Sequence, residues 1–203
     1  MFRLFYLLVL LAFCSSHSFV QAQILVDESW EPPKSQTFSR ASENLSSDLK
    51  AIKKVGVGST LAGATGLLGV NIHVNFSKDF TFVIGAGQSR GFQAFNMHFK
   101  SIFGGRSFQP YFSGGYSRWF ASQDGERVDR TSPPLVKKKF LSSKEINSGN
   151  FSEHIIYPGL GVEFINLDGD WRGLSFFAEA LLLIDIDDLQ TGATAGLGTV
   201  YYF

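Results

Sequence analysis

The ionisable residues whose types and positions could support chemistry are spread over five places in the chain, at His73, His98, Lys100, Glu163 and Glu179. Each lies in a segment where apolar and small or polar residues alternate, and each takes a non-apolar position there. If these positions face a common interior, the buried charges must be paired, because an isolated buried charge is costly. We therefore expect the two glutamates to pair with Lys100, joined by one of the histidines. A path for protons or other ions is the alternative interpretation.

A second candidate combines His154 with the acidic residues Asp185, Asp187 and Asp188. An aspartate and a histidine within hydrogen-bond reach can activate a water molecule for hydrolysis. The acidic run equally fits a solvated loop. A hydrolase that uses histidine and serine on the barrel wall would have a local His-x-Ser pattern, and His73, His98 and His154 all lack it. We expect no enzymatic activity, no cofactor and no metal site.

The segments that carry these residues have a period of two. Over residues 69–76 every even position is apolar and every odd position is small or polar, so one face must meet an apolar environment and the other a polar one. Most such segments are near 10 residues long, and their apolar faces are rich in aromatic residues among the 21 Phe of the chain. These are features of strands that cross a membrane rather than of a soluble sandwich.

Eight strands are predicted, and the connections between them alternate between tight turns and surface loops. The surface loops are predicted at 62–66, 89–91, 121–153 and 185–192, and at least two of them are longer and more charged than the turns. The fold class is therefore all-β, an eight-stranded antiparallel up-and-down transmembrane β-barrel. The strands are predicted at 53–61, 67–77, 79–88, 92–103, 108–120, 154–165, 172–184 and 193–203. Two of them, 108–120 and 172–184, carry large apolar residues on both faces, which a β-bulge or an inward aromatic residue would explain.

The chain divides into three regions. Residues 1–22 have the layout of a cleavable secretory signal, with Arg3, a short apolar run and small residues ending at Ala22. Residues 23–52 form a polar periplasmic extension, flexible at first and with a short helix possible over 43–53, for which a plug or partner-binding segment is the alternative. The barrel occupies residues 53–203.

The longest loop, residues 121–153, contains a basic segment. Its cations are Arg127, Arg130, Lys137, Lys138 and Lys139. Such a segment above an anionic leaflet can bind lipopolysaccharide phosphates, whereas the alternative is a solvated loop. The chain as a whole has 18 Lys and Arg against 18 Asp and Glu, so nothing in its charge supports a nucleic-acid partner.

The C-terminus resembles the terminal-strand signal of bacterial outer-membrane barrels, in Gly198, Tyr201 and the final Phe203. Gly196 departs from that signal at an upstream polar position. Residues 109–116, 159–164 and 177–180 are similar to the OmpA-like and OmpX-like small barrels, on the predicted fifth, sixth and seventh strands. No peptidoglycan-binding domain is expected after the barrel.

This resemblance covers about residues 53–203 and implies a monomer in the outer membrane of a Gram-negative bacterium. The implied partners are outer-membrane lipid, lipopolysaccharide, the barrel-assembly machinery and periplasmic chaperones. We expect a non-enzymatic protein with a structural or surface-interaction role through its extracellular loops. The alternatives are a barrel enzyme acting on lipid A or peptides, and a soluble barrel that binds an apolar ligand.

Overall fold

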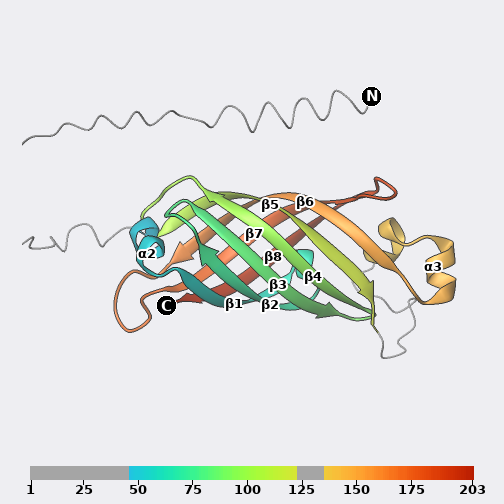
Figure 1. The fold of residues 1–203 in the computed structure, drawn as a ribbon, viewed down its shortest axis with the longest axis horizontal. Coiled ribbons are helices and arrows are strands. Elements are labelled where there is room, and N and C mark those ends of the chain that lie inside the picture. Colours follow the sequence, from blue (N-terminus) through green and yellow to red (C-terminus); the bar gives the residue numbers. More distant parts are fainter. Residues whose placement is uncertain (1–45, 123–134) are drawn as a thin grey trace, which may run out of the picture. The chain divides into compact units, whose positions relative to one another are not determined.

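The computed structural model describes residues 46–122 and 135–203, which form a closed antiparallel barrel whose eight strands pair in chain order (Figure 1). The strands are β1 (Val55–Ala62), β2 (Leu68–Asn75), β3 (Phe80–Ser89), β4 (Phe92–Ile102), β5 (Phe108–Ala121), β6 (Ser152–Ile165), β7 (Leu174–Asp185) and β8 (Thr191–Tyr202). The predicted all-β fold, an eight-stranded antiparallel up-and-down barrel, is confirmed.

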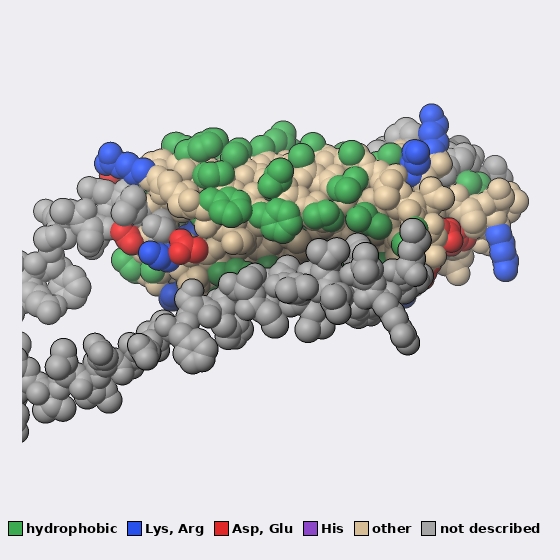
Figure 2. Space-filling view, turned by 90° about the horizontal axis from the view of Figure 1, so that it is seen from above, with side chains coloured by type: hydrophobic (Ala, Val, Ile, Leu, Met, Phe, Trp, Pro, Cys, Tyr) green, Lys and Arg blue, Asp and Glu red, His purple; other side chains and the backbone are tan. Residues whose placement is uncertain are grey.

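Alternation along each strand sorts side chains onto two faces of the wall. On β2, Val70 and Ile72 are exposed on the outside, while Asn71 and His73 are buried inside. The strand register continues the outer row around the barrel, because Ile72 pairs with Ile84 and Ile84 pairs with Met97. Figure 2 shows the result on one face, where apolar side chains cover the middle and charged ones gather at the two ends.

The two strands with apolar residues on both faces place their extra bulk inside the barrel. On β5, Tyr111 and Trp119 point inward and are almost fully buried, and on β7 Phe177, Leu181 and Leu183 do the same. The ladders between β4 and β5 and between β5 and β6 run without a bulge. Inward aromatic and aliphatic side chains therefore explain this pattern.

The described helices lie at opposite ends of the barrel. Helix α2 (Ser46–Ile52) and the C-terminus lie at one end, and α3 (Ser143–Ser148) lies at the other, beside the short π-helical turn η3 (Val136–Phe140) (Figure 1). None of the described helices is both long and apolar enough to cross a membrane.

The connection between β1 and β2 differs from its prediction. Residues 62–66 were expected to form a surface loop, but the 3-10 turn η1 (Gly63–Thr65) is buried inside the barrel. Gly63 and Gly66 have φ values of 84° and 88°, which glycine adopts at little cost and which let the chain turn back inward. The Ala64 carbonyl accepts hydrogen bonds from Ser117 Oγ and Trp119 Nε1, each at 2.9 Å.

Candidate functional site

A buried ion pair inside the barrel joins helix α2 to the wall. Lys50 Nζ on α2 lies 2.7 Å from Glu163 Oε2 on β6, and both side chains are fully buried. The other carboxylate oxygen of Glu163 accepts hydrogen bonds from Ser175 Oγ at 2.6 Å and from the Tyr202 hydroxyl at 2.8 Å. This carboxylate is thus satisfied on both oxygens by donors from three separate elements, as a buried charge requires.

Lys100 and Glu179 also face the lumen, but they do not form the ion pairs expected from the sequence. Lys100 Nζ lies 4.5 Å from the centroid of the Tyr111 ring and 4.2 Å from that of Phe177, and within the described ranges it has no hydrogen-bond partner. Glu179 Oε2 accepts a hydrogen bond from the Tyr111 hydroxyl at 3.1 Å. Lys50, rather than Lys100, is therefore the direct cation partner of Glu163.

The two lumen histidines are held by tyrosine hydroxyls. The Tyr202 hydroxyl lies 3.3 Å from His73 Nδ1, and the Tyr157 hydroxyl lies 3.1 Å from His98 Nδ1. The structure thus brings each of the five sequence-predicted lumen residues into the barrel, where tyrosines connect them. Four of these residues, His73, His98, Lys100 and Glu179, line a cavity of about 10 Å³, which is about the room that one water molecule needs.

Helix α2 closes the barrel end at which the chain enters. Ser46 N donates to the Arg106 carbonyl at 2.8 Å, and Lys53 Nζ donates to the carbonyls of Arg172 and Tyr202 at 3.0 and 2.9 Å. Leu49 packs into an apolar cluster whose other members are Ile165, Leu167, Phe177, Val200 and Tyr202. The helix lies within the expected 43–53 segment, and its burial corresponds to the plug alternative for this part of the extension.

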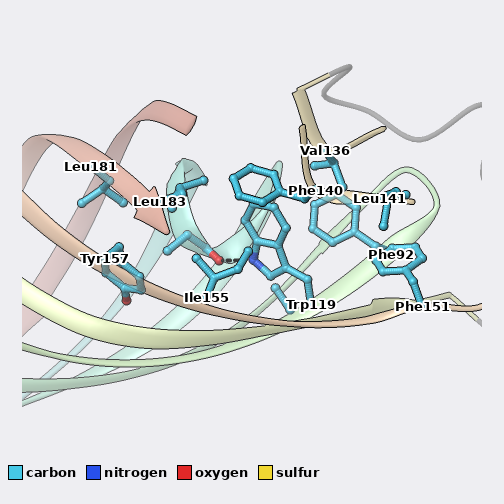
Figure 3. Packing of buried hydrophobic residues seen from close by; sticks show 12 residues of the cluster. Phe92, Trp119, Val136, Phe140, Leu141, Phe151, Ile155, Tyr157, Leu181 and Leu183 are labelled. Carbon is cyan, nitrogen blue, oxygen red and sulfur yellow. Dashed lines mark hydrogen bonds between the residues drawn. The ribbon is translucent and has the colours of Figure 1, made fainter. Parts of the chain in front are cut away.

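An apolar cluster closes the opposite end. Trp119 lies at its centre, with Phe140 of η3 in edge-to-face contact at a centroid distance of 5.7 Å and Phe92 at 5.1 Å (Figure 3). Val136 and Leu141 of the long loop are also buried here. The second half of this loop is therefore packed onto the barrel and does not behave as a purely solvated segment.

His154 and Asp185 lie on opposite faces of the wall, so the proposed hydrolytic pair is not assembled. The Asp185 side chain is fully buried on the inner face. His154 points outward, and its Nδ1 lies 2.6 Å from the Tyr116 hydroxyl. Directly opposite His154 in the β5–β6 ladder is Arg118, whose Nε donates to Ser152 Oγ at 3.1 Å.

Part of the basic loop segment is described. Lys138 and Lys139 are exposed on η3, whereas Arg127, Arg130 and the side chain of Lys137 lie outside the described residues. Helix α3 follows, and a capping box between Ser142 and Glu145 fixes its start. Partial burial opposes ionisation of the Glu145 carboxyl, but hydrogen bonds from Ser142 outweigh this effect and leave its pKa below the ordinary value.

The terminal-strand residues lie on β8 and directly after it. Tyr201 and Phe203 are exposed on the outside, and Phe203 N donates to the Val55 carbonyl at 2.9 Å, next to the start of β1. At Gly198 an added Cβ would lie 2.3 Å from the Phe177 ring, so only glycine leaves room for that inward ring. The strand that closes the barrel thus carries two outward aromatic residues at its end.

Sequence reasoning did not identify Lys50 or Tyr202 as members of the buried network. Lys50 lies in a largely polar segment, and the few apolar residues around it, such as Leu49 and Ile52, gave little sign of burial. Tyr202 lies on the inward parity of β8, and this alternation was the available signal for it.

No family model and no curated protein matches the sequence. Among solved structures, the N-terminal β-barrel domain of Pseudomonas aeruginosa OprF aligns with a TM-score of 0.47 at 16% sequence identity. The alignment covers 73% of this chain and 96% of that domain.

Proposed function

We propose that this chain is an integral outer-membrane barrel protein with a non-enzymatic, structural or surface-interaction role. The observation that carries the proposal is the inverted polarity of the wall. Large apolar side chains such as Val70, Ile72 and Leu160 are 65%, 51% and 64% exposed, while charged side chains such as Lys50 and Glu163 are fully buried. This distribution suits a barrel surrounded by hydrocarbon, since lipid takes the place of a hydrophobic core for the outer face.

The filled lumen supports a role other than conduction. An eight-stranded barrel has an interior just wide enough for side chains to fill. Here η1 enters the lumen, α2 closes one end, and the cluster around Trp119 closes the other. In this proposal the protein contributes a closed, rigid body to the membrane and acts through groups on its surface.

The orientation follows from the length of the connections. The end with α2, the C-terminus and the short turns faces the periplasm, and the end with η3 and α3 faces outward. In this proposal the exposed Lys138 and Lys139 contact lipopolysaccharide phosphates, and Arg127, Arg130 and Lys137 of the same loop contribute further cations. The signal segment 1–22 directs export, and Tyr201 and Phe203 are read by the barrel-assembly machinery after delivery by periplasmic chaperones.

Reconstitution of the full chain into lipid vesicles and planar bilayers tests this function. The folded protein should migrate differently before and after boiling, and its barrel should resist protease in the vesicles. Insertion of a single protein molecule into a planar bilayer should cause no step in the ion current. A protein that stays soluble without detergent would contradict the membrane assignment, and steady open-channel conductance would contradict the closed body.

A further inference from the structure

The outer wall carries a polar patch where the membrane proposal predicts contact with lipid headgroups. Outward positions of β5 and β6 near the long loop hold Tyr116, Arg118, Ser152 and His154, which hydrogen-bond in two pairs. Below them the same face continues as Ile156, Pro158 and Leu160, and on the other side of Arg118 the neighbouring outward residue is Phe95. On the outer wall, these four hydrogen-bonding side chains thus directly border a surface of apolar side chains.

Arg118 has the chemistry for binding a phosphate. Its Nε–H bond to Ser152 Oγ orients the guanidinium plane and leaves the terminal N–H groups for another acceptor. Within residues 46–122 and 135–203 no acidic side chain forms an ion pair with it. A guanidinium binds phosphate through two parallel hydrogen bonds, which are stronger than those between neutral groups.

His154 adds a second donor beside the guanidinium. When the Tyr116 hydroxyl donates to His154 Nδ1, the ring carries its hydrogen on Nε2. The Cα atoms of His154 and Arg118 are direct partners across the ladder, so both side chains stand side by side on the same face. Two donors of this kind can hold one phosphate group between them.

An apolar groove of about 400 Å³ begins two outward positions below His154 on the same strand. This separation of four residues corresponds to about 13 Å along β6. Its lining residues include Phe112, Pro158, Leu160, Ala180, Leu182 and Ala193. Alanines at the outward positions of β7 and β8 leave a depression between the larger side chains.

The wall is also interrupted at the groove. The pairing between β6 and β7 breaks at Tyr157 and Pro158. It resumes at Gly159 with Leu181, and the register is the same on both sides of the break. Proline has no N–H to donate to the ladder, which accounts for the interruption at this strand. The interruption therefore coincides with the groove, because Pro158 is one of its lining residues.

We propose that this face binds one phosphorylated lipid of the outer leaflet, with its phosphate on Arg118 and His154 and an acyl chain in the groove below. The occupant follows from the guanidinium and imidazole donors of the polar patch, combined with an apolar groove that begins two outward positions below them on β6. This inference rests on the proposed membrane function, and it assigns to the wall a lipid site separate from the lysines of the long loop.

Native mass spectrometry of the full chain in detergent, titrated with bisphosphorylated lipid A and with its dephosphorylated form, tests the site. The wild-type protein should retain the phosphorylated lipid in preference to the other. Arg118→Gln should weaken its binding about tenfold, with a smaller loss for His154→Ala. Lys138→Gln, which removes a cation of the loop, should change it much less.

The groove has its own matched pair of variants. Ala180→Leu fills the groove and should lower the affinity for both lipids, whereas Ala86→Leu adds the same bulk at an exposed position of β3 outside the groove and should not. Equal losses in Arg118→Gln and Lys138→Gln, or no effect of Ala180→Leu in a correctly folded barrel, would overturn the site. Each variant is first checked for heat-modifiable migration, and failure of the wild-type protein itself to insert into vesicles would instead overturn the membrane function.

Discussion

Lys50 and Glu163 are 113 residues apart in the chain, yet Lys50 Nζ lies 2.7 Å from Glu163 Oε2 in a fully buried ion pair. The pair ties helix α2 to β6 of the barrel. Removing one partner leaves the other charge buried and uncompensated, a loss that exceeds the value of the pair itself.

Glu163→Gln and Lys50→Met should each lower the free energy of unfolding by about 3–5 kcal/mol, measured by urea unfolding from lipid vesicles. The double variant should be affected less than the sum of the two, because it leaves no unpaired charge. Lys54→Met changes an exposed lysine of the same segment and should have little effect. Strictly additive losses would show that the two residues do not interact in the folded barrel.

Trp119→Phe should lower the free energy of unfolding by about 1–2 kcal/mol, because it removes the indole N–H that donates to the buried Ala64 carbonyl. The Ser117 hydrogen bond to this carbonyl remains, which limits the loss. Trp171→Phe is the matched control, since Trp171 is 67% exposed. Equal effects of the two substitutions would argue against η1 being held inside the lumen.

Phe140→Ala should cost about 3 kcal/mol, because it opens a cavity beside Trp119 at the loop end of the barrel. The neighbouring exposed Lys139→Ala should be close to neutral. The measurement is urea unfolding followed by tryptophan fluorescence. An unchanged midpoint for Phe140→Ala would mean that the loop does not pack on the barrel in the membrane.

Phe203→Asp should strongly reduce the amount of folded protein in the outer membrane, because the closing strand loses its terminal aromatic residue. Phe103→Asp is the matched control, as it places the same charge at another exposed aromatic position near the same end of the barrel. Outer-membrane yield and protease resistance give the readout. Similar yields for the two variants would remove the special role of the C-terminal residue.

The sequence predicted each strand to within two residues, since alternation along a strand is a local property that survives folding. It also placed residues such as Val74, Asn75 and Glu163 on the sides where they are found. The bounds of each strand, and the side of the wall on which each residue lies, can therefore be predicted from the alternation of apolar and polar residues alone.

Contacts between distant segments could not be predicted in this way. Nothing local in the segment around Lys50 indicates that Glu163 is its partner, and the Ala62–Gly66 connection has the glycines of an ordinary surface turn. The length and charge of the long loop favour a surface segment, whereas Val136 and Phe140 are buried against the barrel, so we expect replacement of residues 123–148 to destabilise it. Each of these features depends on how the chain closes in three dimensions.

The central claim is tested most directly by measuring which side chains of β2 face lipid and which face the lumen. Single cysteines would be placed at residues 70 to 75 in a Cys14→Ser background, spin-labelled, and examined in lipid vesicles for collision with oxygen, which concentrates in hydrocarbon. Positions 70, 72 and 74 should show high oxygen accessibility, and positions 71, 73 and 75 should show low accessibility to both oxygen and a water-soluble nickel complex. Uniform accessibility, or high oxygen accessibility at the odd positions, would contradict a closed barrel whose apolar outer wall faces lipid.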